Sequence, residues 1–106
     1  MHPVWRTVLT VLVCLILSAA YARTVKGTVT DAQGKPVEGA AVRLKDAVSL
    51  RIRSARTGKD GVYRFTGLDP SFDYELRATH ADRSSDWVRL SRFDEGEERT
   101  VDLRIK

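Results

Sequence analysis

Length and composition limit this chain to a single small domain. It has 106 residues, of which 42% are hydrophobic and 30% charged, and this mixture argues against intrinsic disorder. One cysteine and two histidines nearly exclude a disulfide scaffold or a zinc site, while 18 Lys and Arg against 14 Asp and Glu make the chain mildly basic rather than polybasic.

The first 22 residues have the pattern of an export signal. Val8–Ala20 is a block of 13 residues in which all but two are apolar. A membrane-spanning helix needs about 20 apolar residues, so the block is short for a permanent anchor. The small residues Ala20 and Ala22 predict signal-peptidase cleavage before Arg23, and cleavage after Ala20 also fits. We therefore expect a cleaved signal helix over 1–22 and a secreted or periplasmic domain over 23–106, an uncleaved anchor being the alternative.

The chain after residue 22 alternates apolar and polar side chains at period two, which is typical of half-buried strands. In the third such segment this pattern places Leu50 and Ile52 on the inward face, and in the sixth it places Trp87 opposite Val88 and Leu90. Seven strands are predicted in this way, at residues 24–30, 40–45, 50–53, 62–66, 74–79, 88–90 and 101–105.

Turn residues separate these predicted strands. Asp31–Pro36 contains a glycine and a proline, neither of which favours a continuous ladder. Gly58–Gly61 ends in Asp-Gly, a hairpin signal, so we expect a hairpin there. No segment sustains a helical period, and no gap accommodates a βαβ crossover. The sequence therefore predicts an all-β, antiparallel Greek-key sandwich of seven strands.

Four separated motifs carry a family resemblance. They are VKGTVTD at 25–31, GKPVEGAAV at 34–42, DGVYRFTGL at 60–68 and YELRA at 74–78. In this order they closely resemble the carboxypeptidase regulatory-like domain, a transthyretin-like β-sandwich. The residues that define the fold in this resemblance are Gly27, Pro36, Gly39, Asp60, Gly61, Tyr63, Phe65 and Tyr74. Gly27 would allow close backbone approach, and Tyr63 and Phe65 would place large rings in the core.

The resemblance implies a non-catalytic module used for folding, docking or ligand binding, with some relatives sharing the starch-binding-like fold. The residues agree with that implication. His80 is the sole histidine after residue 22, at the end of a predicted strand, and neither a metal-ligand spacing nor a G-x-S-x-G elbow is present. We expect no catalytic residue, metal or cofactor.

Charge is unevenly distributed along the chain. Six basic residues and one acid lie between Arg43 and Lys59, and a compact acidic loop follows at 94–98. One interpretation is an outward strand face whose arginines pair with cross-strand acids. The other is a basic face that binds an anionic surface, such as an acidic polysaccharide or a lipid headgroup. The residues proposed for it are Arg43, Lys45, Arg51 and Arg53.

Aromatic residues offer a second candidate site. Trp87 would face outward, where it could stack on a sugar ring or else cover the sandwich end or an edge strand, and Phe72 and Phe93 in loops are candidates for a second platform. We expect a module that binds an envelope or extracellular protein, with carbohydrate as the alternative ligand. An exported chain without interleaved stacking aromatics is a poor nucleic-acid binder, and no permanent membrane span is expected after signal cleavage.

Overall fold

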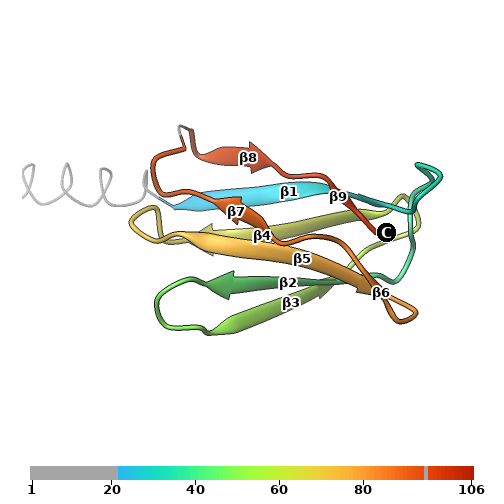
Figure 1. The fold of residues 1–106 in the computed structure, drawn as a ribbon. Coiled ribbons are helices and arrows are strands. Elements are labelled where there is room, and N and C mark those ends of the chain that lie inside the picture. Colours follow the sequence, from blue (N-terminus) through green and yellow to red (C-terminus); the bar gives the residue numbers. More distant parts are fainter. Residues whose placement is uncertain (1–21, 95) are drawn as a thin grey trace, which may run out of the picture.

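The computed structural model describes residues 22–94 and 96–106. The predicted export signal, apart from its last residue, lies outside the described residues. Within them, no helix is long and apolar enough to cross a membrane. The described chain forms two β-sheets that face each other (Figure 1), so the all-β fold class predicted from the alternation is confirmed.

The first sheet is built around the N-terminal strand β1, Arg23–Thr30. Antiparallel to it on one side lies β4, Val62–Leu68. On the other side lie two short strands, β8 at Glu98–Thr100 and β9 at Leu103–Arg104, which both run parallel to β1. This parallel pairing corrects the expectation of a wholly antiparallel sandwich. It arises because the chain crosses from the second sheet before adding its last strands to the first.

The second sheet has β2 and β5 at its centre. β2, Ala41–Asp46, and β5, Tyr74–His80, are antiparallel neighbours. β3, Ile52–Arg56, forms one edge beside β2. Two short segments pair with the other side of β5, namely β6 at Arg83–Ser84 and β7 at Val88–Leu90. Strands β6 and β8 were not predicted, and each is only two or three residues long.

The core lies between the two sheets, because alternate side chains of the central strands point inward. On β1 the buried and half-buried positions alternate over the whole strand, and β5 repeats the pattern as far as Thr79. The buried apolar residues come from both sheets and from the C-terminal segment: Val25, Val29, Ala40, Val42, Leu44, Tyr63, Phe65, Leu68, Tyr74, Leu76, Ala78, Leu90, Val101, Leu103 and Ile105.

The predicted facing of β3 was wrong. Leu50 and Ile52, expected inside, are 62% and 55% exposed. Leu50 lies in the turn before the strand with a positive φ of 62°, and Ile52 is the register partner of Lys45 on the outward face of β2. β3 is an edge strand with few inward neighbours, so its side chains are less buried than those of the central strands. Its alternating apolar residues therefore do not indicate which side faces the core.

The Asp60–Gly61 turn does not close a hairpin. It joins β3 at the edge of one sheet to β4 at the edge of the other. Gly61 has φ 76°, and a Cβ there would lie 2.7 Å from the carbonyl oxygen of Val29. The turn was therefore predicted correctly, but the hairpin was not, because the same turn conformation can also connect strands of different sheets.

One end of the sandwich gathers three loops and the start of the chain. Loops 47–51, 69–73 and 91–94 lie beside Ala22 and the first residue of β1, at the left in Figure 1. We call this the entry end. The opposite end carries the turns at 31–39, 57–61 and 81–82.

Candidate functional site

The outward face of the second sheet carries several cations that the register brings together. On β2 the outward residues are Arg43 and Lys45, and on β5 they include Arg77. Arg43 and Arg77 are direct register partners in adjacent strands. We define the basic face as Arg43, Lys45, Arg56, Arg77 and Trp87.

Trp87 lies at the β7 edge of this face. Its ring centroid is 4.7 Å from Lys45 Nζ and 5.6 Å from the Arg77 Cζ, so two cations from neighbouring strands lie at cation–π distance. The residue is 41% exposed. The outward orientation that its parity predicted places an aromatic ring next to the basic side chains, where it is partly covered by them and partly open to a ligand.

Few acids neutralise the basic face. Lys45 Nζ lies 3.7 Å from Glu75 Oε2, its register partner. Among the described residues, Arg43, Arg56 and Arg77 form no ion pair. Instead, Arg77 Nε donates to the Ser85 carbonyl at 3.3 Å and Arg56 Nη1 donates to the Gly39 carbonyl at 3.1 Å. Like charges directly opposed across strands are unfavourable, so the Arg43–Arg77 pair leaves uncompensated positive charge on this face.

A shallow depression of about 350 Å³ lies on the β2–β3 side of the basic face. Arg43 and Arg56 flank it, and the small residues Ala41, Ser54 and Ala55 complete its lining. Two guanidinium groups on either side of a small-residue floor suit a carboxylate or sulfate group, because guanidinium binds planar oxyanions through paired hydrogen bonds.

The remaining residues of the predicted basic run lie elsewhere. Arg51 is in the loop before β3, and Lys59 is in the turn after it. Arg53 points over the edge of the sandwich, where its Nη1 donates to the Thr66 carbonyl at 3.0 Å and its Cζ lies 5.5 Å from the Phe65 ring centroid. Arg77 was not among the predicted site residues. The signal that could have found it is its parity with Glu75 on β5.

The three candidate aromatic platforms are not brought together. Phe72 lies in the β4–β5 loop and Phe93 in the β7–β8 loop, both at the entry end. Phe93 lies under the Arg92 guanidinium, 4.8 Å from ring centroid to Cζ. Among the described residues the one aromatic pair in contact is Tyr63 with Phe65, inside the core.

Tyr63 and Gly27 lock the first sheet to the C-terminal segment. The buried Tyr63 hydroxyl donates to the Val101 carbonyl oxygen at 2.5 Å. The same oxygen lies 1.8 Å from the position that a Cβ on Gly27 would occupy. Burial, with a smaller contribution from the Asp102 carboxylate, raises the pKa of Tyr63 well above its usual value. Its hydroxyl therefore acts as a neutral structural donor rather than as an acid or base.

The other motif residues shape turns and the entry end. Pro36 forms an isolated bridge with Thr30, and Gly39 has φ 75° before β2. The Tyr74 ring is buried, and its hydroxyl accepts a hydrogen bond from the Asp69 amide at 3.1 Å.

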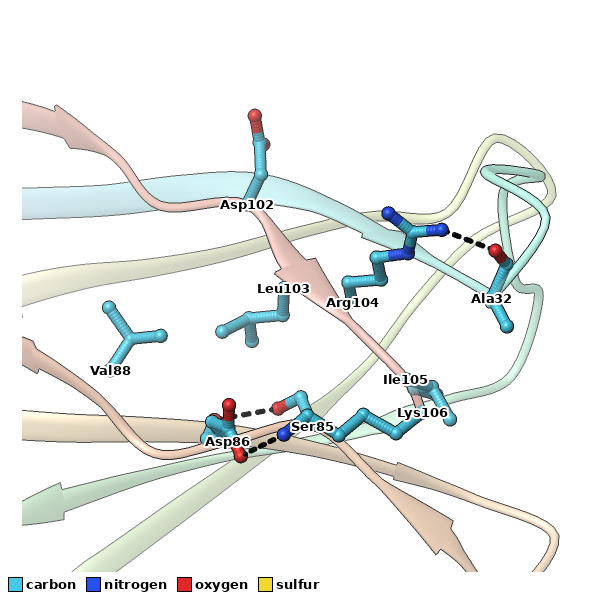
Figure 2. Close-up of a pocket in the computed structure, with 9 residues that line it drawn as sticks. All are labelled: Ala32, Ser85, Asp86, Val88, Asp102, Leu103, Arg104, Ile105 and Lys106. Carbon is cyan, nitrogen blue, oxygen red and sulfur yellow. Dashed lines mark hydrogen bonds and ion pairs between the residues drawn. The ribbon is translucent and has the colours of Figure 1, made fainter.

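A groove of about 410 Å³ opens between β9 of the first sheet and the segment before β7 of the second (Figure 2). Its apolar lining comes from Val88, Leu103 and Ile105. Lys106 Nζ and Asp86 Oδ1 form an ion pair across it at 2.9 Å, and the Arg104 guanidinium donates to the Ala32 carbonyl at its rim. None of the predicted site residues lines this groove.

His80 lies exposed at the end of β5 and pairs in register with Arg83. In residues 22–94 and 96–106, no three His, Cys, Asp or Glu side chains are grouped closely enough to hold a metal ion.

Together, the two facing sheets, the close approach at Gly27 and the inter-sheet turn at Gly61 define a small β-sandwich domain. The model of the carboxypeptidase regulatory-like domain family matches residues 24–106, and the chain belongs to this family. The resemblance drawn from the four motifs is thereby confirmed.

Solved structures share the fold at low sequence identity. A dioxygenase domain from Streptomyces sp. SirexAA-E, part of a dioxygenase carbohydrate-binding protein fusion, aligns with TM-score 0.57 and 19% identity over 80% of this chain and 79% of that one. A streptococcal ancillary pilin aligns with TM-score 0.61 and 15% identity over 80% of this chain and 32% of that one. Catechol 1,2-dioxygenase from Pseudomonas arvilla C-1 aligns with TM-score 0.58 and 16% identity over 81% of this chain and 52% of that one.

This chain spans about a third of the pilin and half of the catechol dioxygenase. No curated protein matches it. Because the family is described as regulatory-like and the structural identities are all below 20%, the likeness to dioxygenases and pilins is one of fold.

Proposed function

We propose that this chain is an exported, non-catalytic binding module whose basic face docks an acidic region of an envelope or extracellular protein. The observation that carries the proposal is the direct opposition of Arg43 and Arg77 in adjacent strands, without an acid paired to either among the described residues. A partner carboxylate near this pair would relieve the repulsion and gain charge-assisted hydrogen bonds.

The shape of the face fits a protein partner. A sheet surface presents several long side chains in rows, and here β2 and β5 each place a cation within cation–π distance of Trp87. Tryptophan and arginine are enriched at the energetic centres of protein interfaces. Export is supported by the Val8–Ala20 block and the small residues that follow it.

The experiment is affinity capture from envelope extract with residues 22–106, followed by titration of the purified captured protein. We expect a partner with an acidic surface whose binding weakens about tenfold or more in R43S/R56S/R77S and weakens with added salt. The matched control K35S/K59S/R64S removes the same charge from exposed positions outside the basic face. Equal loss in both variants, or no specific protein captured, would contradict the proposal.

A second candidate is an acidic carbohydrate, which is favoured by the half-exposed Trp87 ring among cations and by the depression between Arg43 and Arg56. A glycan array distinguishes the cases. Binding to acidic glycans that weakens with added salt and in R43S/R56S/R77S would favour the carbohydrate. Loss of this binding in Trp87→Ala would show that the ring stacks on the sugar. Signal on neutral sugars alone would point away from the basic face.

A further inference from the structure

The entry end exposes an unusual number of large apolar side chains. Val48 is 83% and Phe93 78% exposed, and Leu50, Ile52 and Phe72 are exposed around them. They come from three loops that are far apart in sequence, and from the first residue of β3, at one end of the sandwich (Figure 1). Elsewhere in the described chain, only two large apolar residues are exposed, Val62 and Trp87.

In each of these loops an aspartate side chain accepts a backbone amide of the same turn, while the apolar side chain is exposed. Asp46 Oδ1 accepts the amide of Val48 at 2.8 Å, and Asp69 Oδ1 accepts that of Ser71, next to Phe72, at 2.8 Å. In the third loop, Asp94 Oδ2 accepts the amide of Ser91 at 3.1 Å. The acids are thereby used within the turns, and the tips present hydrocarbon.

The loops are also tied to one another. The Asp73 carboxylate accepts the Arg92 amide at 2.6 Å and pairs with the Arg89 guanidinium at 2.8 Å, while its carbonyl accepts the Ala47 amide at 3.0 Å. The buried Arg23, the first residue of β1, donates to the Ser91 carbonyl at 3.2 Å. One residue thus links all three loops, and the start of β1 supports the third. The apolar tips form a prearranged surface rather than independent flexible loops.

The chain enters the domain at this same end. Ala22 lies next to β1, and the apolar block Val8–Ala20 ends two residues before it. A membrane that holds this block, before cleavage or as the uncleaved anchor, would lie next to the loop tips. We infer that the entry end is a membrane-contacting surface, with Val48, Leu50, Phe72 and Phe93 inserting into the interfacial region of a lipid bilayer and Arg92 remaining at the headgroups.

Leu50 gives an independent reason to assign a role outside the fold. It adopts φ 62°, a conformation that favours glycine or asparagine and is rarely adopted by a bulky side chain, yet its side chain is 62% exposed. A leucine there strains the backbone without burying its side chain in the core. A contact with an apolar environment outside the protein would make use of it.

The test is co-flotation of residues 22–106 with phosphatidylcholine vesicles, alone and with about one third phosphatidylglycerol. We expect binding to both, because apolar insertion drives it, and a loss of about tenfold or more in V48S/L50S/F93S. The control Val62→Ser removes a large apolar side chain that is exposed outside the entry end, and it is expected to float like the parent chain.

Leu50→Asn separates a role in membrane binding from a role in stability, because a leucine needed for the fold would lower the melting temperature when replaced. We expect it to raise the melting temperature by a few degrees, by relieving the positive-φ strain, while it weakens vesicle binding several-fold. The inference is overturned if the parent chain does not float, if V48S/L50S/F93S floats like Val62→Ser, or if the tips are buried in a homodimer that V48S/L50S/F93S dissociates in the absence of lipid.

Discussion

At the residue scale, Gly27 is the glycine with the least room for a side chain. A Cβ there would lie 1.8 Å from the Val101 carbonyl oxygen and 2.6 Å from its carbon. Both are backbone atoms, so no side-chain movement relieves the clash. We expect Gly27→Ala to lower the free energy of unfolding by about 3 kcal/mol or more, as measured by urea denaturation. Gly58→Ala is the control, since its nearest neighbour is a flexible Asp60 side-chain atom at 3.4 Å and its cost should stay within about 1 kcal/mol.

A second residue-scale prediction concerns Asp73 and pH. The Arg92 amide, and then the Arg89 guanidinium, hold the pKa of Asp73 below its ordinary value of 3.8. A carboxyl whose pKa is depressed by folding stabilises the native state above pH 3.8, and this contribution disappears as pH falls through the folded-state pKa. In urea titrations the parent chain should be more stable than Asp73→Asn at neutral pH, and the difference should shrink as the solution is acidified from about pH 5 to 2. A constant difference would contradict this.

At the element scale, the β5–β6 connection is a two-residue turn built from unfavourable residues. His80 pairs with Arg83, and both intervening residues, Ala81 and Asp82, have positive φ, at 48° and 65°. Turns of this kind favour Asn-Gly, because alanine pays a steric cost in the left-handed region. We expect A81N/D82G to raise the free energy of unfolding by about 1 kcal/mol in thermal or urea melts. Unchanged or lower stability would show that the turn is not a source of strain.

At the scale of the whole molecule, the two sheets of the described chain enclose a core whose apolar residues run from Val25 to Ile105. These buried residues all follow the predicted export signal in the sequence. Residues 22–106 should therefore fold without it, with a far-ultraviolet circular dichroism spectrum typical of β-structure and a single cooperative melting transition. A helical spectrum, or a transition that requires residues 1–21, would contradict this arrangement.

The central strands could be predicted from the sequence because they have neighbours on both sides. β1 and β5 carry the alternation almost throughout, since each is buried against the opposite sheet. β3 could not be predicted in the same way. As an edge strand it leaves Ile52 on the surface and turns Arg53 toward the rim, so its apolar residues do not mark the core.

The candidate site was only partly predictable. Arg43 and Lys45 belong to one strand and share a parity that the sequence shows directly. Arg77 lies 34 positions beyond Arg43, and only the antiparallel register of β2 with β5 makes the two opposite each other. The same limit applies to Trp87, whose outward direction followed from its own strand while its cationic neighbours did not.

The sequence by itself determined the all-β class, the inward positions of the central strands and the turn residues, because side-chain alternation and backbone conformation are local properties of the chain. Only the tertiary structure decided the parallel pairing of β1 with β8 and β9, the inter-sheet role of Asp60–Gly61, and the meeting of three loops at the entry end. These depend on which distant segments become neighbours. That choice is made by packing the whole core at once, so it leaves no pattern within any single segment.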